Sequence, residues 1–215
     1  MLQSDLKLYE SQGSPNARRV RIFLAEKGIN VELIPVDIAA KAQFSPAYSA
    51  INPRNVVPTL VLEDGTAIGE VPAIWRYLEE VYPEKPLLGT DAKDRALVAM
   101  WERWAEQEGF AAVMEAVRNW LPGLAGRALA GPHAYEQIPA LVERSEARIG
   151  HFYTDLNARL EAAAFVAGDR FSAADITAVV AIDFAVAALE LDLPDDLPAL
   201  RTWYATVSVR RSLSA

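Results

Sequence analysis

The chain has 215 residues, room for one large domain or two modest ones, and its 52% apolar and 23% charged residues are ordinary for a globular protein. Its net charge of −8 argues against nucleic acid or an anionic membrane as the main partner. The absence of cysteine excludes disulfides and thiolate metal sites, and two histidines cannot alone build a zinc site. Without a signal-peptide core or a membrane-spanning apolar run, the sequence predicts a soluble cytoplasmic protein with no metal.

The first part of the chain mixes strand and helix patterns. Apolar alternation predicts a strand over residues 6–9, and Ser14 followed by Pro15 is a favoured helix start. The spacing of apolar residues predicts that this helix runs to Gly28, and residues 31–38 form a second strand.

The next segment, residues 40–52, is polar and predicts at most a short helix. Residues 58–62 and 67–68 flank the letters EDGT, in which Asp-Gly is a turn signal, so they predict a hairpin. Helical spacing then returns over residues 71–82.

The rest of the chain is helical in its apolar period. The segment PEKPLLGTD, residues 83–91, reads as a linker because it carries prolines and a glycine. Four helices are expected after it, over about 92–119 and 138–163, from Ser172 onward, and over 199–209. The start of the third of these is well specified: Ser172 is a favoured N-cap, and Asp175 can close an acidic capping box, which predicts a stability element.

This order of elements, together with three local stretches, resembles the glutathione transferase family. The stretches are SPNARRVRIFLAEKG (14–28), SPAYSAINPRNVVPTLVLEDGTAIGEVPAIWRYLEEVYP (45–83) and FVAGDRFSAADIT (165–177), and MWERWAEQEGF (100–110) is closest to an atypical branch of bacteria and yeast. The resemblance implies an α/β N-terminal thioredoxin-like domain, residues 1–83, that binds glutathione. A linker, 84–91, would join it to an all-α helical bundle, residues 92–215, with a pocket for an electrophile.

Pro58 stands at the head of a predicted strand, although proline donates no backbone hydrogen bond. In this family the peptide bond before that proline is cis, which implies that the N–H and C=O of Val57 face a cleft and pair with the cysteinyl main chain of glutathione, as an added strand does. The alternative is a trans proline that only begins a strand.

The resemblance also assigns partners to the charged ends of glutathione. Glu70 would accept from the γ-glutamyl ammonium, and the N–H of Val71 would bind the neighbouring α-carboxylate at a helix start. Val71 replaces the usual serine, so a hydroxyl donor is lost. Gln43 and Arg54 are the candidates for the glycine carboxylate. As alternatives, Glu70 is a first-turn helix acid, and Gln43 and Arg54 are solvated surface residues.

The thiol of glutathione must lose a proton near neutral pH, although its ordinary pKa is about 8.5. By resemblance Ser14 donates a hydrogen bond to the thiolate, and this role is compatible with capping, which uses only a lone pair of the hydroxyl. Asn16 is the second candidate. Members of the atypical branch use a bound water held by a histidine near the end of the first long helix, but the matching letters VRNWLP, residues 117–122, contain none.

The function predicted from the resemblance is conjugation of the glutathione thiolate to a small apolar electrophile by a cytoplasmic homodimer. Trp104, Phe110, Met114 and Trp120 are candidates for the walls of the electrophile pocket, whereas Trp101 reads as core. One alternative is a non-catalytic relative that binds a ligand or another protein, which the departures at Val71 and Asn55 favour. Another is a glutathione-dependent disulfide-bond reductase.

Overall fold

A computed structural model describes the backbone of residues 2–215 and the side chains from Asp5 onward. The chain forms two compact units. The first comprises residues up to Pro86 with residues 130–133 and the last residues of the chain, and the second comprises 87–129 and 134–213. The predicted boundaries at 83/84 and 91/92 remain a prediction. Among residues 2–215, no helix is both long and apolar enough to cross a membrane.

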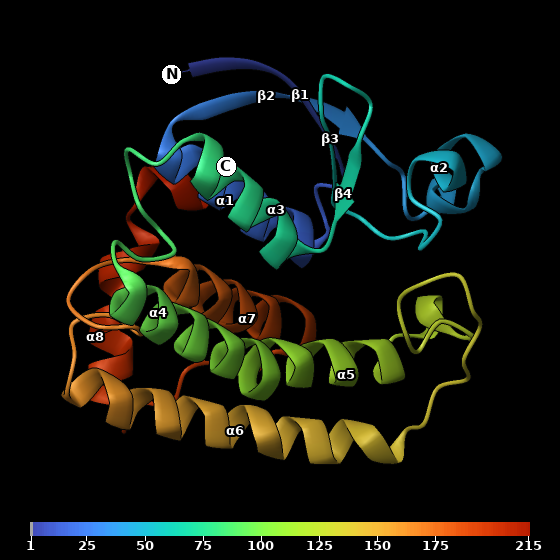
Figure 1. Ribbon diagram of the computed structural model, residues 1–215. Helices are drawn as coiled ribbons and strands as arrows, with labels where there is room; N and C mark the ends of the chain where they lie inside the picture. The colour runs from blue at the N-terminus through green and yellow to red at the C-terminus, as the bar shows by residue number, and fades with distance from the viewer. Residues whose placement is uncertain (1) are drawn as a thin grey trace. The chain divides into compact units, whose positions relative to one another are not determined.

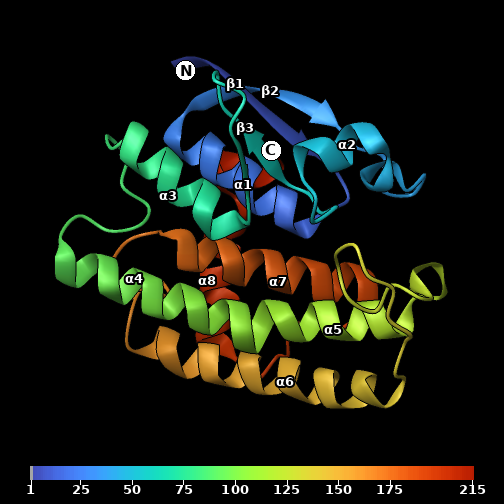
Figure 2. The same cartoon turned by 45° about the vertical axis from the view of Figure 1, so that its right-hand side comes forward.

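The first unit is a mixed four-stranded sheet with helices, as the resemblance predicted. The strand order is β2-β1-β3-β4, with β1 parallel to β2 and antiparallel to β3, and β3 antiparallel to β4. Helices α1 and α3 lie side by side along one face of the sheet (Figures 1 and 2). In chain order the elements are β1 (Leu2–Glu10), α1 (Pro15–Lys27), β2 (Ile29–Pro35), a 3-10 turn (Ala42–Phe44), α2 (Pro46–Ile51), β3 (Thr59–Val61), β4 (Ala67–Gly69) and α3 (Val71–Val81).

Helix α1 starts and stops at the residues that the sequence indicated. The Oγ atom of Ser14 accepts from the N–H of Ala17 at 3.3 Å, Pro15 occupies the first turn, and Gly28 ends the helix at φ 72°. A left-handed residue at this position favours glycine because a Cβ atom would be strained there. One strand was placed too late along the chain: β2 spans Ile29–Pro35 rather than 31–38, because its register with β1 begins at Ile29.

The second unit is all helical. A continuous helical run lies beside α6 on one side and α7 on the other (Figure 2). Its elements are α4 (Ala92–Trp104), a π-helical segment (Ala105–Phe110), α5 (Ala111–Trp120), a 3-10 turn (Pro122–Leu124), α6 (Ala140–Glu161), α7 (Ala173–Leu189), α8 (Pro198–Ser208) and a terminal 3-10 turn (Arg211–Ser214).

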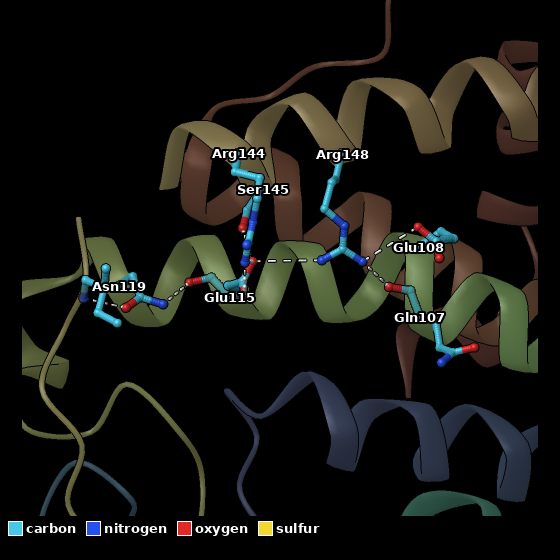
Figure 3. A network of polar contacts seen from close by, with 8 residues as sticks. Gln107, Glu108, Glu115, Asn119, Arg144, Ser145 and Arg148 are labelled. Atoms are coloured by element: carbon cyan, nitrogen blue, oxygen red, sulfur yellow. Dashed lines mark hydrogen bonds and ion pairs between the residues drawn. The ribbon is translucent and has the colours of Figure 1, made fainter. Parts of the chain in front are cut away.

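The π-helical segment was not predicted, and α6 supports it with polar contacts. Arg148 donates to the carbonyl oxygen of Gln107 at 2.6 Å, inside the segment, and lies 3.6 Å from Glu108 (Figure 3). Gly109 is required here, because a Cβ atom would lie 2.6 Å from the ring of Phe152.

About two turns beyond Glu108, Glu115 joins α5 to α6. Its carboxylate accepts from Ser145 at 2.6 Å and from Arg144 at 2.9 and 3.0 Å (Figure 3). Burial opposes the charge of Glu115, but these hydrogen bonds outweigh it and hold the pKa of the carboxyl below its ordinary value. The network therefore fixes the packing of two neighbouring helices.

Candidate functional site

Three segments of the first unit meet at one end of its sheet. Strand pairing places Tyr9 of β1 opposite Thr59 of β3, and Thr59 opposite Gly69 of β4. The loop that follows β1, the segment that precedes β3 and the turn that follows β4 therefore emerge together. These three segments carry Ser14, Val57 and Glu70, which are candidates separated widely in sequence.

The Val57–Pro58 peptide bond is cis, which confirms the prediction for this proline. Within the described part of the chain, no group pairs with the backbone N–H or C=O of Val57, and the ladder of β3 begins only at Thr59. An extended peptide can therefore add to this segment by main-chain hydrogen bonds.

A cluster of buried side chains holds the residue just before Val57. The carbonyl oxygen of Val56 accepts from the hydroxyl of Tyr48 at 2.6 Å, from Nδ2 of Asn52 at 3.1 Å and from the hydroxyl of Thr59 at 3.4 Å. All three donors are buried. Burial is the main cause that raises the pKa of Tyr48 above its ordinary value, which keeps this hydroxyl protonated. We call Tyr48, Asn52 and Thr59 the carbonyl clamp.

The carbonyl clamp was not predicted from the sequence. Asn52 alone carried a signal, since it begins the NPRN stretch. Asn55, which stands where the family often has glycine, adopts φ 54°, and its side chain hydrogen-bonds to the hydroxyl of Ser49 at 2.9 Å. Asparagine tolerates this left-handed conformation better than most residues.

The turn after β4 leads directly into α3 with an unusual backbone. Glu70 lies at φ 63° and ψ 124°, a sparsely populated region for a residue with a Cβ atom, and its side chain makes no capping hydrogen bond. The N–H groups of Ala73 and Ile74 donate to the carbonyl of Glu70, and Pro72 has no N–H. Among the described residues, the N–H of Val71 has no acceptor, so the start of α3 is open to an anion.

The remaining candidates lie in the same unit. Ser14 is buried, with 8% of its surface exposed. The cap uses only a lone pair of its hydroxyl, and among the described residues no group accepts the hydroxyl proton, which can therefore donate to a ligand. The Oδ1 atom of Asn16 accepts from Arg19 at 3.2 Å, which leaves its amide N–H groups for other acceptors. Gln43 is half-buried and its Oε1 atom has no partner among the residues described. Arg54 is exposed and lies 3.7 Å from Glu70.

The candidates for the electrophile pocket all belong to the helical run of the second unit. Trp104 packs on Phe152 with ring centroids 5.1 Å apart, and Phe110 is buried. Met114 is half-buried, whereas 54% of the surface of Trp120 is exposed. Within residues 5–215, no cluster of three or more histidine, aspartate or glutamate side chains is arranged to hold a metal ion.

Comparison with known proteins decides the family. The N-terminal domain model of glutathione S-transferases matches residues 8–86, and the C-terminal domain model matches residues 139–206. Glutathione S-transferase 2 of Saccharomyces cerevisiae is 31% identical over 217 residues, covering 99% of this chain and 89% of the yeast protein. The chain belongs to the glutathione transferase family.

Solved structures agree with this membership. A glutathione S-transferase domain-containing protein from Marinobacter aquaeolei is 36% identical, with a TM-score of 0.89 over 96% of this chain and 99% of the other. Yeast Gtt2 is 30% identical, with a TM-score of 0.88 over 97% and 98%. The predicted fold class and the likeness to a bacterial and yeast branch are confirmed. A maleylacetoacetate isomerase of Pseudomonas aeruginosa is also similar, 33% identical over 62% of this chain and 69% of that protein.

Proposed function

We propose that this member of the family transfers the thiolate of glutathione to a small apolar electrophile. The observation that supports this most is the meeting of three open groups at one end of the sheet: the Ser14 hydroxyl, the Val57 backbone and the start of α3. Each matches one part of glutathione: the thiol, the cysteinyl main chain and the γ-glutamyl end.

Binding would begin from the main chain. The N–H and C=O of Val57, beside Pro58, pair with the cysteinyl residue as an added strand does. Glu70 accepts from the γ-glutamyl ammonium, and the N–H of Val71 donates to its α-carboxylate. Gln43 is proposed for the glycine carboxylate, because its half-buried side chain carries amide N–H groups that can donate to a carboxylate.

The chemical step is nucleophilic attack by sulfur. A donated hydrogen bond from Ser14, or from the amide of Asn16, stabilises the thiolate and lowers the pKa of the thiol, whose proton leaves to solvent. The thiolate then forms a carbon–sulfur bond, and an aromatic electrophile expels its halide. The protein positions the reactants and forms no covalent bond itself.

The second substrate is proposed to meet apolar side chains of the α4–α5 run, with Trp104, Phe110, Met114 and Trp120 as candidates. We also propose that two copies of the chain associate, since symmetric dimers are common among soluble oligomers.

A glutathione-dependent isomerase is the second candidate, because a maleylacetoacetate isomerase is among the similar proteins. Reversible addition of the same thiolate to a conjugated double bond would allow rotation without leaving sulfur on the product. The binding roles of Val57, Glu70 and Val71 are the same in both reactions, so the candidates differ only in the second substrate.

The test begins with calorimetric titration of glutathione and continues with turnover of a chlorodinitrobenzene-type electrophile and of maleylacetoacetate. Binding with conjugation supports the transferase, and binding with isomerisation alone supports the second candidate. Binding without either turnover points to a ligand-binding relative. A lack of binding at millimolar glutathione contradicts the proposal.

The role of Ser14 is tested separately by Ser14→Ala. The pH–rate profile is expected to show the thiol pKa rising by about one unit or more toward its ordinary value. Since this change also removes a helix cap, Asp91→Ala is a matched control: Asp91 caps α4 by accepting from the N–H of Asp94 at 2.9 Å and lies outside the site. An unchanged pKa in Ser14→Ala would move the role to Asn16 or to water.

A further inference from the structure

Arg54 and Glu70 form an ion pair beside the open start of α3. The Nε atom of Arg54 lies 3.7 Å from Oε1 of Glu70, and 68% of each side chain is exposed. The register of Thr59 with Gly69 brings the segment before β3 next to the turn after β4, which is why these residues meet. Exposed ion pairs contribute little to stability, so a ligand can rearrange this pair at small cost.

The start of α3 is short of donors for a carboxylate. A carboxylate has two oxygen atoms to satisfy. Among the described residues, the backbone at this helix start offers only the N–H of Val71. Pro72 has no N–H, and the next two N–H groups already donate to the carbonyl oxygen of Glu70. The Val71 side chain adds no donor. Arg54 provides a cationic donor here, because its guanidinium pairs with Glu70.

We propose that Arg54 and Glu70 together receive the α-amino-acid zwitterion of the γ-glutamyl group. Glu70 accepts from its ammonium, while Arg54 donates to the carboxylate on the same carbon atom and takes the place of the missing serine hydroxyl. Protein and ligand then present opposite charges in matching order, and guanidinium–carboxylate hydrogen bonds are among the stronger ones in proteins. The inference rests on the proposed function, and it selects γ-glutamyl peptides with both α-groups free.

Under this proposal Arg54 does not bind the glycine carboxylate, for which the sequence had made it a candidate. An extended tripeptide spans about 10 Å, so a side chain in an ion pair with the γ-glutamyl acceptor does not also reach the glycine carboxylate. The glycine end is left to Gln43. Glu70 has a strained backbone with a positive φ, and its side chain does not cap α3. Strained residues of this kind cluster at ligand-binding sites, which is consistent with the proposed role.

The experiment combines a substitution with two altered ligands. Arg54→Gln and the wild-type protein are titrated by calorimetry with glutathione, with an analogue that lacks the γ-glutamyl α-carboxylate, and with the glycine monoethyl ester of glutathione. Arg76→Gln is the matched control, since Arg76 is an exposed arginine of α3. Thermal unfolding of each variant verifies that it is folded.

The expected result is a loss of about tenfold in the affinity of Arg54→Gln for glutathione, the size typical of a charge-assisted hydrogen bond. The same loss should appear with the glycine ester and vanish with the analogue that lacks the α-carboxylate. Arg76→Gln should bind all three ligands as the wild type does.

Three results would overturn the inference alone: no loss for glutathione, an equal loss for every ligand, or a loss that vanishes only with the glycine ester. The last of these would return Arg54 to the glycine carboxylate. If the wild-type protein itself binds no glutathione at millimolar concentration, the proposed function fails as well, so the two failures are distinguishable.

Discussion

The starts of helices α7 and α3 differ in whether their polar groups have partners within the chain. At α7 the buried carboxylate of Asp175 accepts from the N–H and hydroxyl of Ser172, from the N–H of Val166 and from Nε1 of Trp203, all at 2.9 to 3.0 Å. At α3 the side chain of Glu70 caps nothing and the N–H of Val71 has no acceptor among the described residues. A start that satisfies its own groups stabilises the fold, whereas a start left open is available to a ligand.

The largest expected effect breaks the closed start. Asp175→Ala leaves the donors of Val166 and Trp203 buried without an acceptor, and we expect the free energy of unfolding to fall by about 3–5 kcal/mol at neutral pH. Urea denaturation measures this loss. Asp169→Ala, which removes an exposed carboxylate from the loop before α7, should change the same quantity by less than about 0.5 kcal/mol. Equal effects of the two substitutions would show that the cap is not a stability element.

The pH dependence of stability is a second test of the start of α7. Burial raises the pKa of Asp175 from an ordinary value of 3.8 to about 6, although four hydrogen bonds oppose the rise. The folded state therefore binds the proton of Asp175 more tightly than the unfolded state does. The stabilisation of the fold by this proton is complete below about pH 4 and is lost as pH rises through 6. The stability difference between the wild type and Asp175→Asn should narrow by about 2 kcal/mol from pH 4 to pH 7. A difference that does not depend on pH would contradict this account.

The carbonyl clamp holds Val56 and thereby supports the neighbouring backbone of Val57 in the proposed glutathione site. Tyr48→Phe removes one donor from the Val56 carbonyl, and we expect a loss of about 1–2 kcal/mol of stability. Glutathione affinity, measured by calorimetric titration, should fall severalfold because Val57 is held less firmly. Tyr82→Phe, a half-buried tyrosine of the same unit, is the control. Unchanged affinity in Tyr48→Phe would mean that the clamp serves only the fold.

The smallest expected effect on stability comes from the open start itself. Glu70→Gly relieves a backbone at φ 63°, so the free energy of unfolding should rise by about 1 kcal/mol. Glutathione binding should weaken because the ammonium loses its acceptor. Thermal unfolding and titration of one protein sample measure both. If Glu70→Gly is less stable than the wild type and binds glutathione equally well, the proposed contrast between the starts of α3 and α7 is wrong.

The sequence predicted the closed start better than the open one. Ser172 and Asp175 lie three positions apart and form a local pattern, as do Ser14 with Pro15 and the EDGT turn, so their geometry follows from neighbours in the chain. The cis bond at Pro58 was predicted from the family resemblance, because no local pattern distinguishes it.

The features that escaped prediction depend on distant residues or on small changes of period. The Arg54–Glu70 pair and the contacts of Tyr48 with Val56 and Thr59 require the strand register, which apolar spacing does not give. The π-helical segment covers only six residues, too few to change the apolar period visibly, and Gly109 alone marks it.

A crystal structure of the protein with glutathione tests the central claim most directly. We predict that the N–H and C=O of Val57 pair with the cysteinyl main chain, while the γ-glutamyl group lies at the start of α3 between Glu70 and Arg54. Glutathione bound elsewhere, or an intramolecular partner on the Val57 backbone and the Val71 N–H, would contradict it.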